Sequence, residues 1–472
     1  MKISPELIQT YAGLSSLGES YLDFIVKHEG NRVPLRLSDY PVPPSMASYH
    51  VELQPVPLLV DKAYAESTFR EATCRVVDLV KKLMRVVFDN DAGAIADYYG
   101  FKTPDRVRQA LQGAEFGNNI IARNDFIMTR DGLKCLEVNA TSTLGGWFVP
   151  FFTDMYLNHF PVSEFFARHS DKVFSTPDTL GMFFEYLVSS TRKLEKFSGS
   201  RVLNLAIISK ELESDVSKTR QAMVNHFFSS SMNKLGLEGE LVITSSADDI
   251  RLLDDSLFIR GKPIHTVVTS SADELNLDIL RAFSLGNVYW PDNLLCYAYN
   301  DKSNFALLHK YRDSEHFTDD DRRIIDSYIP RSWLLSDKTL QLEGETVNTA
   351  EFVLAGQKRL IIKDIKGKQG DNVFIGPKCS EQEWRDIIAS ALEDGQWLVQ
   401  EYCESAPFIG QCGEHGLAEY DHVWGLFSFA DSYAGGSIRM MTKAGTDGVI
   451  NAAKGAKEGL IIQVDELNRS TG

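Results

Sequence analysis

The chain has 472 residues, of which 43% are hydrophobic and 11% aromatic, a composition that can build folded cores and excludes a chain disordered throughout. The length exceeds the roughly 250–300 residues at which a single core usually stops growing, so more than one domain is expected. The formal net charge of −16 argues against nucleic acid as a partner, because phosphate-binding surfaces need a basic field.

No membrane association and no secretion are expected. The longest apolar stretches, such as residues 202–208, are too short to cross a bilayer. Residues 1–18 lack the basic region and apolar run of a signal peptide. The six cysteines are scattered without framework spacing, as is typical of reduced thiols. We therefore expect a cytoplasmic protein.

Residues 1–117 are predicted to be mostly helical and to form a wall beside a substrate site. Residues 67–87 carry apolar side chains at helical spacing, and Thr103-Pro104 is typical of a capped helix start.

Residues 118–200 are predicted to begin with a β-hairpin. Short β-like runs occupy 118–123, 125–129 and 133–138, and Asp131-Gly132 between the last two is a strong hairpin signal. Asp125 and Glu137 should therefore lie on neighbouring antiparallel strands. Asn139 is two residues beyond Glu137 and shares its face. These oxygen donors suit magnesium, although a hairpin with an ordinary polar face explains the same residues.

Residues 201–298 are predicted to form a parallel α/β layer, because strand-like and helix-like runs alternate there. The strand-like runs are 202–208, 239–244, 256–261 and 265–270, and the helix-like runs are 217–235 and 275–285. The segment has no G-x-G-x-x-G fingerprint, so no dinucleotide site is expected.

Residues 299–462 contain the candidate phosphate-binding residues, and residues 463–472 are expected to form a tail. Lys363 ends a strand and is followed by a loop in which Gly367 and Gly370 allow backbone N–H groups to approach phosphate. The strand 397–402 can present backbone groups to an adenine edge, and Arg439 can clamp a phosphoryl group. Each feature alone also fits a plain hairpin turn, a buried strand or a surface ion pair.

Taken together and in this order, these stretches resemble the circularly permuted branch of the ATP-grasp superfamily, most closely the synthetase domain of glutathionylspermidine synthase and its carboxylate–amine ligase relatives. In ordinary ATP-grasp enzymes the metal-binding strands follow the lysines, whereas here they come first. The resemblance covers most of residues 120–460. It implies an α/β (α+β) fold: a permuted ATP-grasp fold with a Rossmann-like section at 201–298 and an N-terminal helical region.

The resemblance also implies roles for individual residues. Arg123 and Asp125 match the family's R-x-D, and Glu137 with Asn139 matches its E-x-N. Lys302 matches an ATP-binding lysine, although Asp301 is inserted between it and Asn300. The implied sets are catalytic Arg123 and Arg439; ligands for two Mg²⁺ ions from Asp125, Glu137 and Asn139; and ATP contacts from Lys302, Lys363, Gly367, Lys368, Gln369, Gly370, Asn372, Gln400, Glu401, Tyr402 and Cys403.

The implied activity is ATP-dependent joining of a small, amino-acid-like carboxylate to an amine through an acyl-phosphate. The residues after Asn139 read ATSTLGGW and depart from the synthetase's aspartate-containing continuation, so glutathione and spermidine are not assumed as substrates. A small-molecule kinase using the same cleft and a non-catalytic ATP-binding protein are the alternatives. A homodimer is compatible with the sequence.

Overall fold

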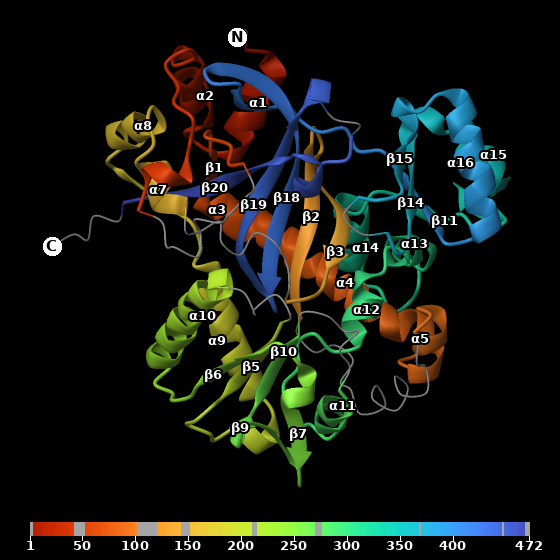
Figure 1. The fold of residues 1–472 in the computed structure, drawn as a ribbon. Helices are drawn as coiled ribbons and strands as arrows, with labels where there is room; N and C mark the ends of the chain where they lie inside the picture. Colours follow the sequence, from red (N-terminus) through yellow and green to blue (C-terminus); the bar gives the residue numbers. More distant parts are fainter. Residues whose placement is uncertain are drawn as a thin grey trace.

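The computed structural model describes residues 3–41, 52–101, 120–142, 152–209, 215–269, 276–342, 344–367, 370–445 and 448–467. These residues form a mixed α/β structure in which one large sheet, one small sheet and a separate α/β layer are set apart from one another (Figure 1). The helix expected after Thr103-Pro104 and the predicted ATP contacts Lys368 and Gln369 lie outside the described residues. No helix in the described ranges is long and apolar enough to span a membrane.

The large sheet has eight strands. Its main path runs β1 (Leu58–Asp61), β20 (Lys457–Glu466), β19 (Ser432–Thr442), β18 (Gly416–Phe429), β2 (Ile121–Thr129) and β3 (Gly132–Asn139); β17 (Phe408–Cys412) pairs with β18, and β4 (Lys172–Ser175) with β20. All pairings are antiparallel except that of β1 with β20. Two strands remote in the chain, β2 and β19, thus flank the same strand, β18.

Helices bury the apolar face of this sheet. The long helix α4 (Arg70–Phe88) follows a π-helical turn, Ala65–Phe69, and packs against β19, β18, β2 and β3. Its buried residues recur at helical spacing, as predicted for 67–87. Shorter helices near the same sheet include α1 (Pro5–Leu14), α2 (Gly18–Lys27), α3 (Lys62–Tyr64), α7 (Thr153–Leu157) and α8 (Val162–Arg168). Helix α5 (Ala92–Tyr98) follows α4 and packs against it.

The predicted hairpin is confirmed. β2 and β3 pair directly across the Arg130-Asp131 turn, with Asp125 opposite Glu137 and Arg123 opposite Asn139. The two runs predicted at 118–123 and 125–129 belong to one continuous strand from Ile121 onward. A bulge after Asp125 shifts the register.

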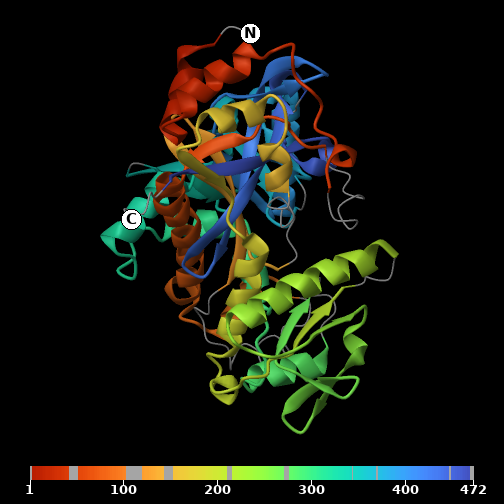
Figure 2. The same ribbon diagram turned by 90° about the vertical axis from the view of Figure 1, so that its left-hand side faces the viewer.

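The parallel α/β layer is also present but smaller than predicted (Figure 2). β5 (Leu205–Ile208), β6 (Leu241–Thr244) and β10 (Thr266–Thr269) are parallel, in the order β10-β5-β6. Helices α9 (Thr179–Thr191), α10 (Asp215–Lys234) and α11 (Leu277–Ser284) accompany them.

The run 256–261 was wrongly predicted to join that layer. It forms β8 (Ser256–Ile259) of a separate antiparallel sheet with β7 (Ile250–Leu253) and β9 (Lys262–Ile264). Two-residue turns connect these strands, whereas parallel neighbours need a crossover of a dozen or more residues. In the turn at Arg260-Gly261 both residues have positive φ, as a tight hairpin turn requires.

The small sheet has four antiparallel strands in the order β11 (Ser332–Leu334), β16 (Trp397–Glu401), β14 (Leu360–Asp364) and β15 (Val373–Ile375). Helices α15 (Thr349–Ala355) and α16 (Glu381–Asp394) cover one face, and buried Trp384 of α16 donates its indole N–H to the Val353 carbonyl. The chain reaches this sheet through α12 (Leu295–Asn300), α13 (Ser303–Lys310) and α14 (Asp319–Tyr328), and a hairpin of β12 (Thr339–Leu342) and β13 (Glu345–Asn348) follows β11.

The C-terminal end differs from the prediction. Residues 463–466, expected in a tail, lie in β20, a strand that was not predicted. Three strands hold β20 in the sheet: β19 pairs with its first half, and β1 and β4 pair with its second half. The large sheet therefore joins strands from the segments 1–117, 118–200 and 299–462 into one layer.

Candidate functional site

A pocket between the large and the small sheet gathers most of the predicted site residues. It is lined by Asp125, Ile127, Leu136, Glu137, Lys302, Ile361, Lys363, Gly367, Gly370, Asp371, Val373, Ile375, Glu401, Tyr402, Cys403, Val423, Arg439, Gly448, Val449, Ile450 and Asn451. The metal-ligand candidates on the early hairpin thus face the lysines and the glycine-rich loop from the later half of the chain.

An arginine–aspartate–arginine cluster forms one end of this pocket. Asp125 accepts hydrogen bonds from Arg123 Nε at 2.9 Å and from Arg439 Nη2 at 2.5 Å. Burial raises the pKa of this carboxyl group, but the two guanidinium groups outweigh it and lower the pKa to about 2. Asp125 is therefore a buried carboxylate at neutral pH, and it holds both arginines in place.

A glycine on the intervening strand makes this cluster possible. Gly425 of β18 pairs with Asp125 on one side and with Ser437 on the other. A Cβ atom at Gly425 would lie 2.9 Å from Arg123 Cδ, which is closer than two carbons approach without overlap. The missing side chain thus leaves room for Arg123.

Lys302 connects the hairpin to the glycine-rich loop. Its ammonium lies 3.7 Å from Glu137 Oε2 and donates to the Gly367 carbonyl. The two residues before Lys302 hold this segment in place. The carboxylate of the inserted Asp301 accepts a hydrogen bond from the Ser303 N–H at the start of α13. The side-chain oxygen of Asn300 accepts one from the Ala140 N–H just after β3.

Lys363 is buried beside the pocket. Its ammonium donates to Gln400 Oε1 at 2.6 Å and to the Leu136 carbonyl at 3.4 Å. Burial lowers its pKa to about 8, and Lys302 adds to this effect while Glu137 opposes it. Gln400, predicted to contact ATP, does not line the pocket; its side chain is fully buried between Lys363 and Ser332.

The loop after Lys363 is closed at its base by Asp364. The Asp364 carboxylate accepts from the Lys366 N–H at 2.9 Å and from Asn372 Nδ2 at 3.2 Å. Asn372, also predicted to contact ATP, therefore organises the loop and does not line the pocket. Gly367 and Gly370 do line it, as predicted.

Two further predicted residues act from behind the pocket surface. Asn139 donates to the Arg123 carbonyl at 3.2 Å, and neither residue is among those lining the pocket. Arg123 contacts Asp125, which does line the pocket, through an ion pair of 2.9 Å.

The donor set fits magnesium held together with phosphate. In the described part of the chain, no three His, Cys, Asp or Glu side chains gather as a metal site. Asp125 and Glu137 are two carboxylates on paired strands, and the Asn139 carboxamide follows on β3. Magnesium usually takes one or two carboxylates and completes its shell with phosphate oxygens and water. An ion bridged to nucleotide phosphates therefore suits these residues, whereas an all-protein site does not.

The apolar walls of the pocket were missed. They come from Ile127, Leu136, Ile361, Val373, Ile375, Val423, Val449 and Ile450. Period-two alternation could have identified two of them, because Ile127 shares a strand face with Asp125 and Ile361 shares one with Lys363. Val449 and Ile450 lie outside any strand, so no such signal marks them.

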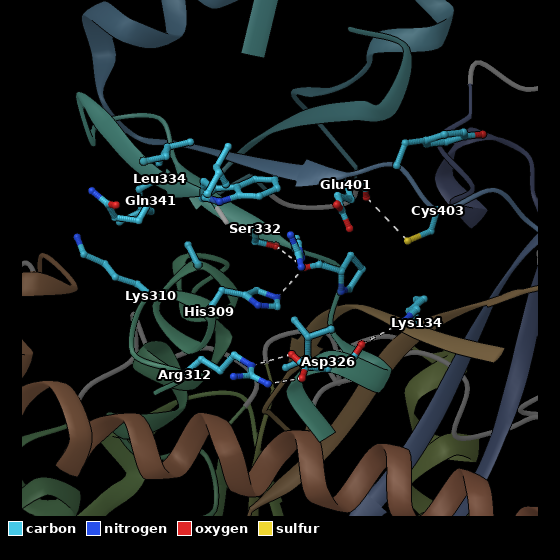
Figure 3. A pocket seen from close by; sticks show the side chains of 18 of the residues that line it. Lys134, His309, Lys310, Arg312, Asp326, Ser332, Leu334, Gln341, Glu401 and Cys403 are labelled. Atoms are coloured by element: carbon cyan, nitrogen blue, oxygen red, sulfur yellow. Dashed lines mark hydrogen bonds and ion pairs between the residues drawn. The ribbon is translucent and has the colours of Figure 1, made fainter. Parts of the chain in front are cut away.

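A second, larger groove borders the end of β16 and the residues that follow it (Figure 3). It has a volume of about 1110 Å³ and shares Glu401, Tyr402 and Cys403 with the pocket. Some of its charged side chains are paired with one another, as in Lys310 with Asp337 at 3.1 Å and Arg312 with Asp326 at 2.5 Å. Neither Lys302 nor Lys363 lines this groove, whereas both line the smaller pocket, which is therefore the candidate site.

No protein-family model matches the sequence, and no curated protein matches it significantly. Several solved structures are similar to the chain. One is a protein from Methylobacillus flagellatus KT, provisionally assigned as a gamma-glutamylcysteine synthetase; it has 14% identity and a TM-score of 0.43, over 83% of this chain and 88% of that chain. Another is D-alanyl-alanine synthetase A from Vibrio cholerae O1 biovar eltor str. N16961, with 10% identity and a TM-score of 0.26, over 57% and 89%. With TM-scores this low, neither likeness establishes the fold or the activity of this chain.

Proposed function

We propose that this protein is an ATP-dependent ligase of the ATP-grasp type, in circularly permuted order, that joins a carboxylic acid to an amine. The observation that carries the proposal is the convergence of Asp125 and Glu137 with Lys302, Lys363 and Arg439 on one pocket. Carboxylates for metal, lysines for phosphate and an arginine for a developing anion are the groups that phosphoryl transfer to a carboxylate needs.

The pocket suits a nucleotide at both ends. Apolar side chains of the two sheets line the pocket together with Glu401, Tyr402 and Cys403, and this part of it would receive the purine ring. The cationic end would receive the triphosphate. Magnesium ions, two in this proposal, would be held by Asp125 and Glu137 with phosphate oxygens, and they would neutralise phosphate charge. Asn139, predicted as a third ligand, lies behind the pocket surface with its side-chain N–H on the Arg123 carbonyl, so only its carboxamide oxygen could contribute.

The reaction proposed has two steps. The carboxylate oxygen attacks the γ-phosphorus of ATP, the bond to ADP breaks, and an acyl-phosphate forms. The amine nitrogen then attacks the acyl carbon, phosphate leaves, and the nitrogen loses a proton to solvent. Lys302 and Lys363 would hold the phosphates, Arg439 would stabilise negative charge on the reacting group, and the loop at 364–372 would limit the access of water.

The experiment is an ATP-consumption screen with amino acids and related small acids as carboxylates and varied amines as acceptors. The proposal predicts ADP and phosphate release that requires one acid and one amine together. A stable phosphorylated product formed without an amine would identify a kinase instead. Failure to bind ATP in the presence of magnesium, measured by calorimetry, would contradict any nucleotide-dependent function.

A further inference from the structure

A directed chain of hydrogen bonds runs from the pocket into the small sheet. Lys363 Nζ donates to Gln400 Oε1 at 2.6 Å, Gln400 Nε2 donates to Ser332 Oγ at 3.0 Å, and Ser332 Oγ donates to the Pro330 carbonyl at 2.8 Å. Gln400 pairs with Ile361 on one side and with Ser332 on the other, so its side chain lies between those of the two neighbouring strands.

The orientation of the Gln400 amide is dictated from both ends. An ammonium group only donates, so Lys363 requires the amide oxygen. The Ser332 hydroxyl has one hydrogen, which the Pro330 carbonyl takes, so this hydroxyl must accept and requires the amide nitrogen. A flipped amide would place two donors together at Lys363. Gln400 is fully buried, so water has no access to its side chain to replace either contact.

We propose that Gln400 is a positioning residue, which holds the Lys363 ammonium toward the nucleotide phosphates and makes no contact with the base. The inference rests on the proposed nucleotide site and adds one residue to it. Lys363 donates to the Gln400 side-chain oxygen at 2.6 Å and to the Leu136 carbonyl at 3.4 Å, so the Gln400 oxygen is the nearer acceptor. Without the Gln400 oxygen, the Lys363 ammonium loses the hydrogen bond that orients it.

The experiment is a double-mutant cycle read out by calorimetry with the non-hydrolysable ATP analogue AMPPNP and Mg²⁺. Gln400→Leu keeps a side chain of similar size but provides no acceptor, and Lys363→Met removes the ammonium. Gln400→Leu should weaken binding about tenfold, the value expected for losing a hydrogen bond to a charged group. In the Lys363→Met background, Gln400→Leu should have no further effect, because the group it acts through is gone.

Two controls separate positioning from general damage. Gln411→Leu replaces another buried glutamine, in β17 and outside the pocket, and should leave AMPPNP affinity unchanged. Ser332→Ala removes the hydroxyl that accepts from the Gln400 amide, at the end of the hydrogen-bond series farthest from Lys363. It should weaken AMPPNP binding less than Gln400→Leu does. The preference for the adenine analogue over the corresponding guanine analogue should be the same in Gln400→Leu as in the wild type.

The outcomes distinguish this inference from the proposed function. Equal losses from Gln400→Leu in both backgrounds, or an altered base preference, would overturn the positioning role while leaving the nucleotide site in place. Absence of AMPPNP binding by the wild-type protein would overturn the nucleotide site and the inference with it.

Discussion

Asp125 and Arg439 lie 314 residues apart in the chain, yet the Oδ2 atom of one and the Nη2 atom of the other are separated by 2.5 Å. Their strands do not pair directly: β18 lies between β2 and β19, and the two side chains meet across it. This ion pair joins the early hairpin to the last part of the chain at one end of the pocket.

Asp125→Asn should destabilise the protein strongly. The substitution removes the charge that pairs with Arg123 and Arg439, two largely buried guanidinium groups that share this carboxylate. Removing one partner of a buried ion pair typically costs about 3–5 kcal/mol. Urea unfolding at pH 7 measures the free-energy difference; a loss below about 1 kcal/mol, typical of exposed pairs, would contradict the cluster.

The contribution of Asp125 should also depend on pH in a defined direction. Its pKa is lowered from 3.8 to about 2 in the folded protein, so the folded state binds this proton less tightly than the unfolded chain. The stabilisation is complete above about pH 4 and is lost as the pH falls through about 2. The difference in unfolding free energy between wild type and Asp125→Asn should shrink over this interval. A constant difference would show that the ionised form is not responsible.

Glu137→Ala should abolish measurable ATP-dependent ligation and leave the fold intact. The side chain is 32% exposed and its ion pair with Lys302 is long, 3.7 Å, so little folding energy depends on it. Loss of a principal electrostatic group typically costs about 2.7–4 kcal/mol in the barrier, or about 10²–10³ in rate. ADP release measures this loss. Glu345→Gln, on exposed β13, is the matched control and should retain full activity; normal turnover by Glu137→Ala would refute the metal assignment.

Gly425→Ala should lower both activity and stability. The new Cβ atom would approach Arg123 Cδ to 2.9 Å and would push that flexible side chain away from Asp125. Displacing an aligned charged group by about 1 Å can cost up to about a hundredfold in rate. Steady-state kinetics and thermal unfolding together test this expectation. Gly13→Ala, where the added atom meets nothing within 4 Å, is the control; equal kinetics in both variants would contradict the role of Gly425.

ATP affinity should fall as the pH rises through about 8. Burial lowers the pKa of Lys363 to about this value, and only the protonated ammonium attracts phosphate. The decline should be visible in kcat/KM for ATP, which reports on the free enzyme. Lys363→Arg keeps its charge at this pH, so its profile should stay flat there. A decline of the same size in Lys363→Arg would assign the titration to another group.

Local features of the site could be predicted from the sequence. The Asp-Gly turn and the flanking β-like runs determine the hairpin, because its two strands are joined by a two-residue turn and need no partner elsewhere to find their register. That Asp125 and Glu137 lie on neighbouring strands follows directly, but the register of the turn alone would place Leu136 opposite Asp125, and it is the bulge after Asp125 that brings Glu137 there. The glycine-rich loop after Lys363 could be recognised for the same reason: its constraints lie within a few residues.

Only the tertiary structure decided which of these residues meet. Alternation along β16 shows which face Gln400 occupies, but not that the acceptor it offers is taken by Lys363. No local pattern shows that β18 separates Asp125 from Arg439, or that β20 continues to Glu466 between its partners. These facts depend on pairing between distant strands, whose order is set by the burial of the whole sheet against α4 and its neighbours. The sequence by itself determined the chemistry of each segment; the packing of the sheets decided that the segments share one pocket.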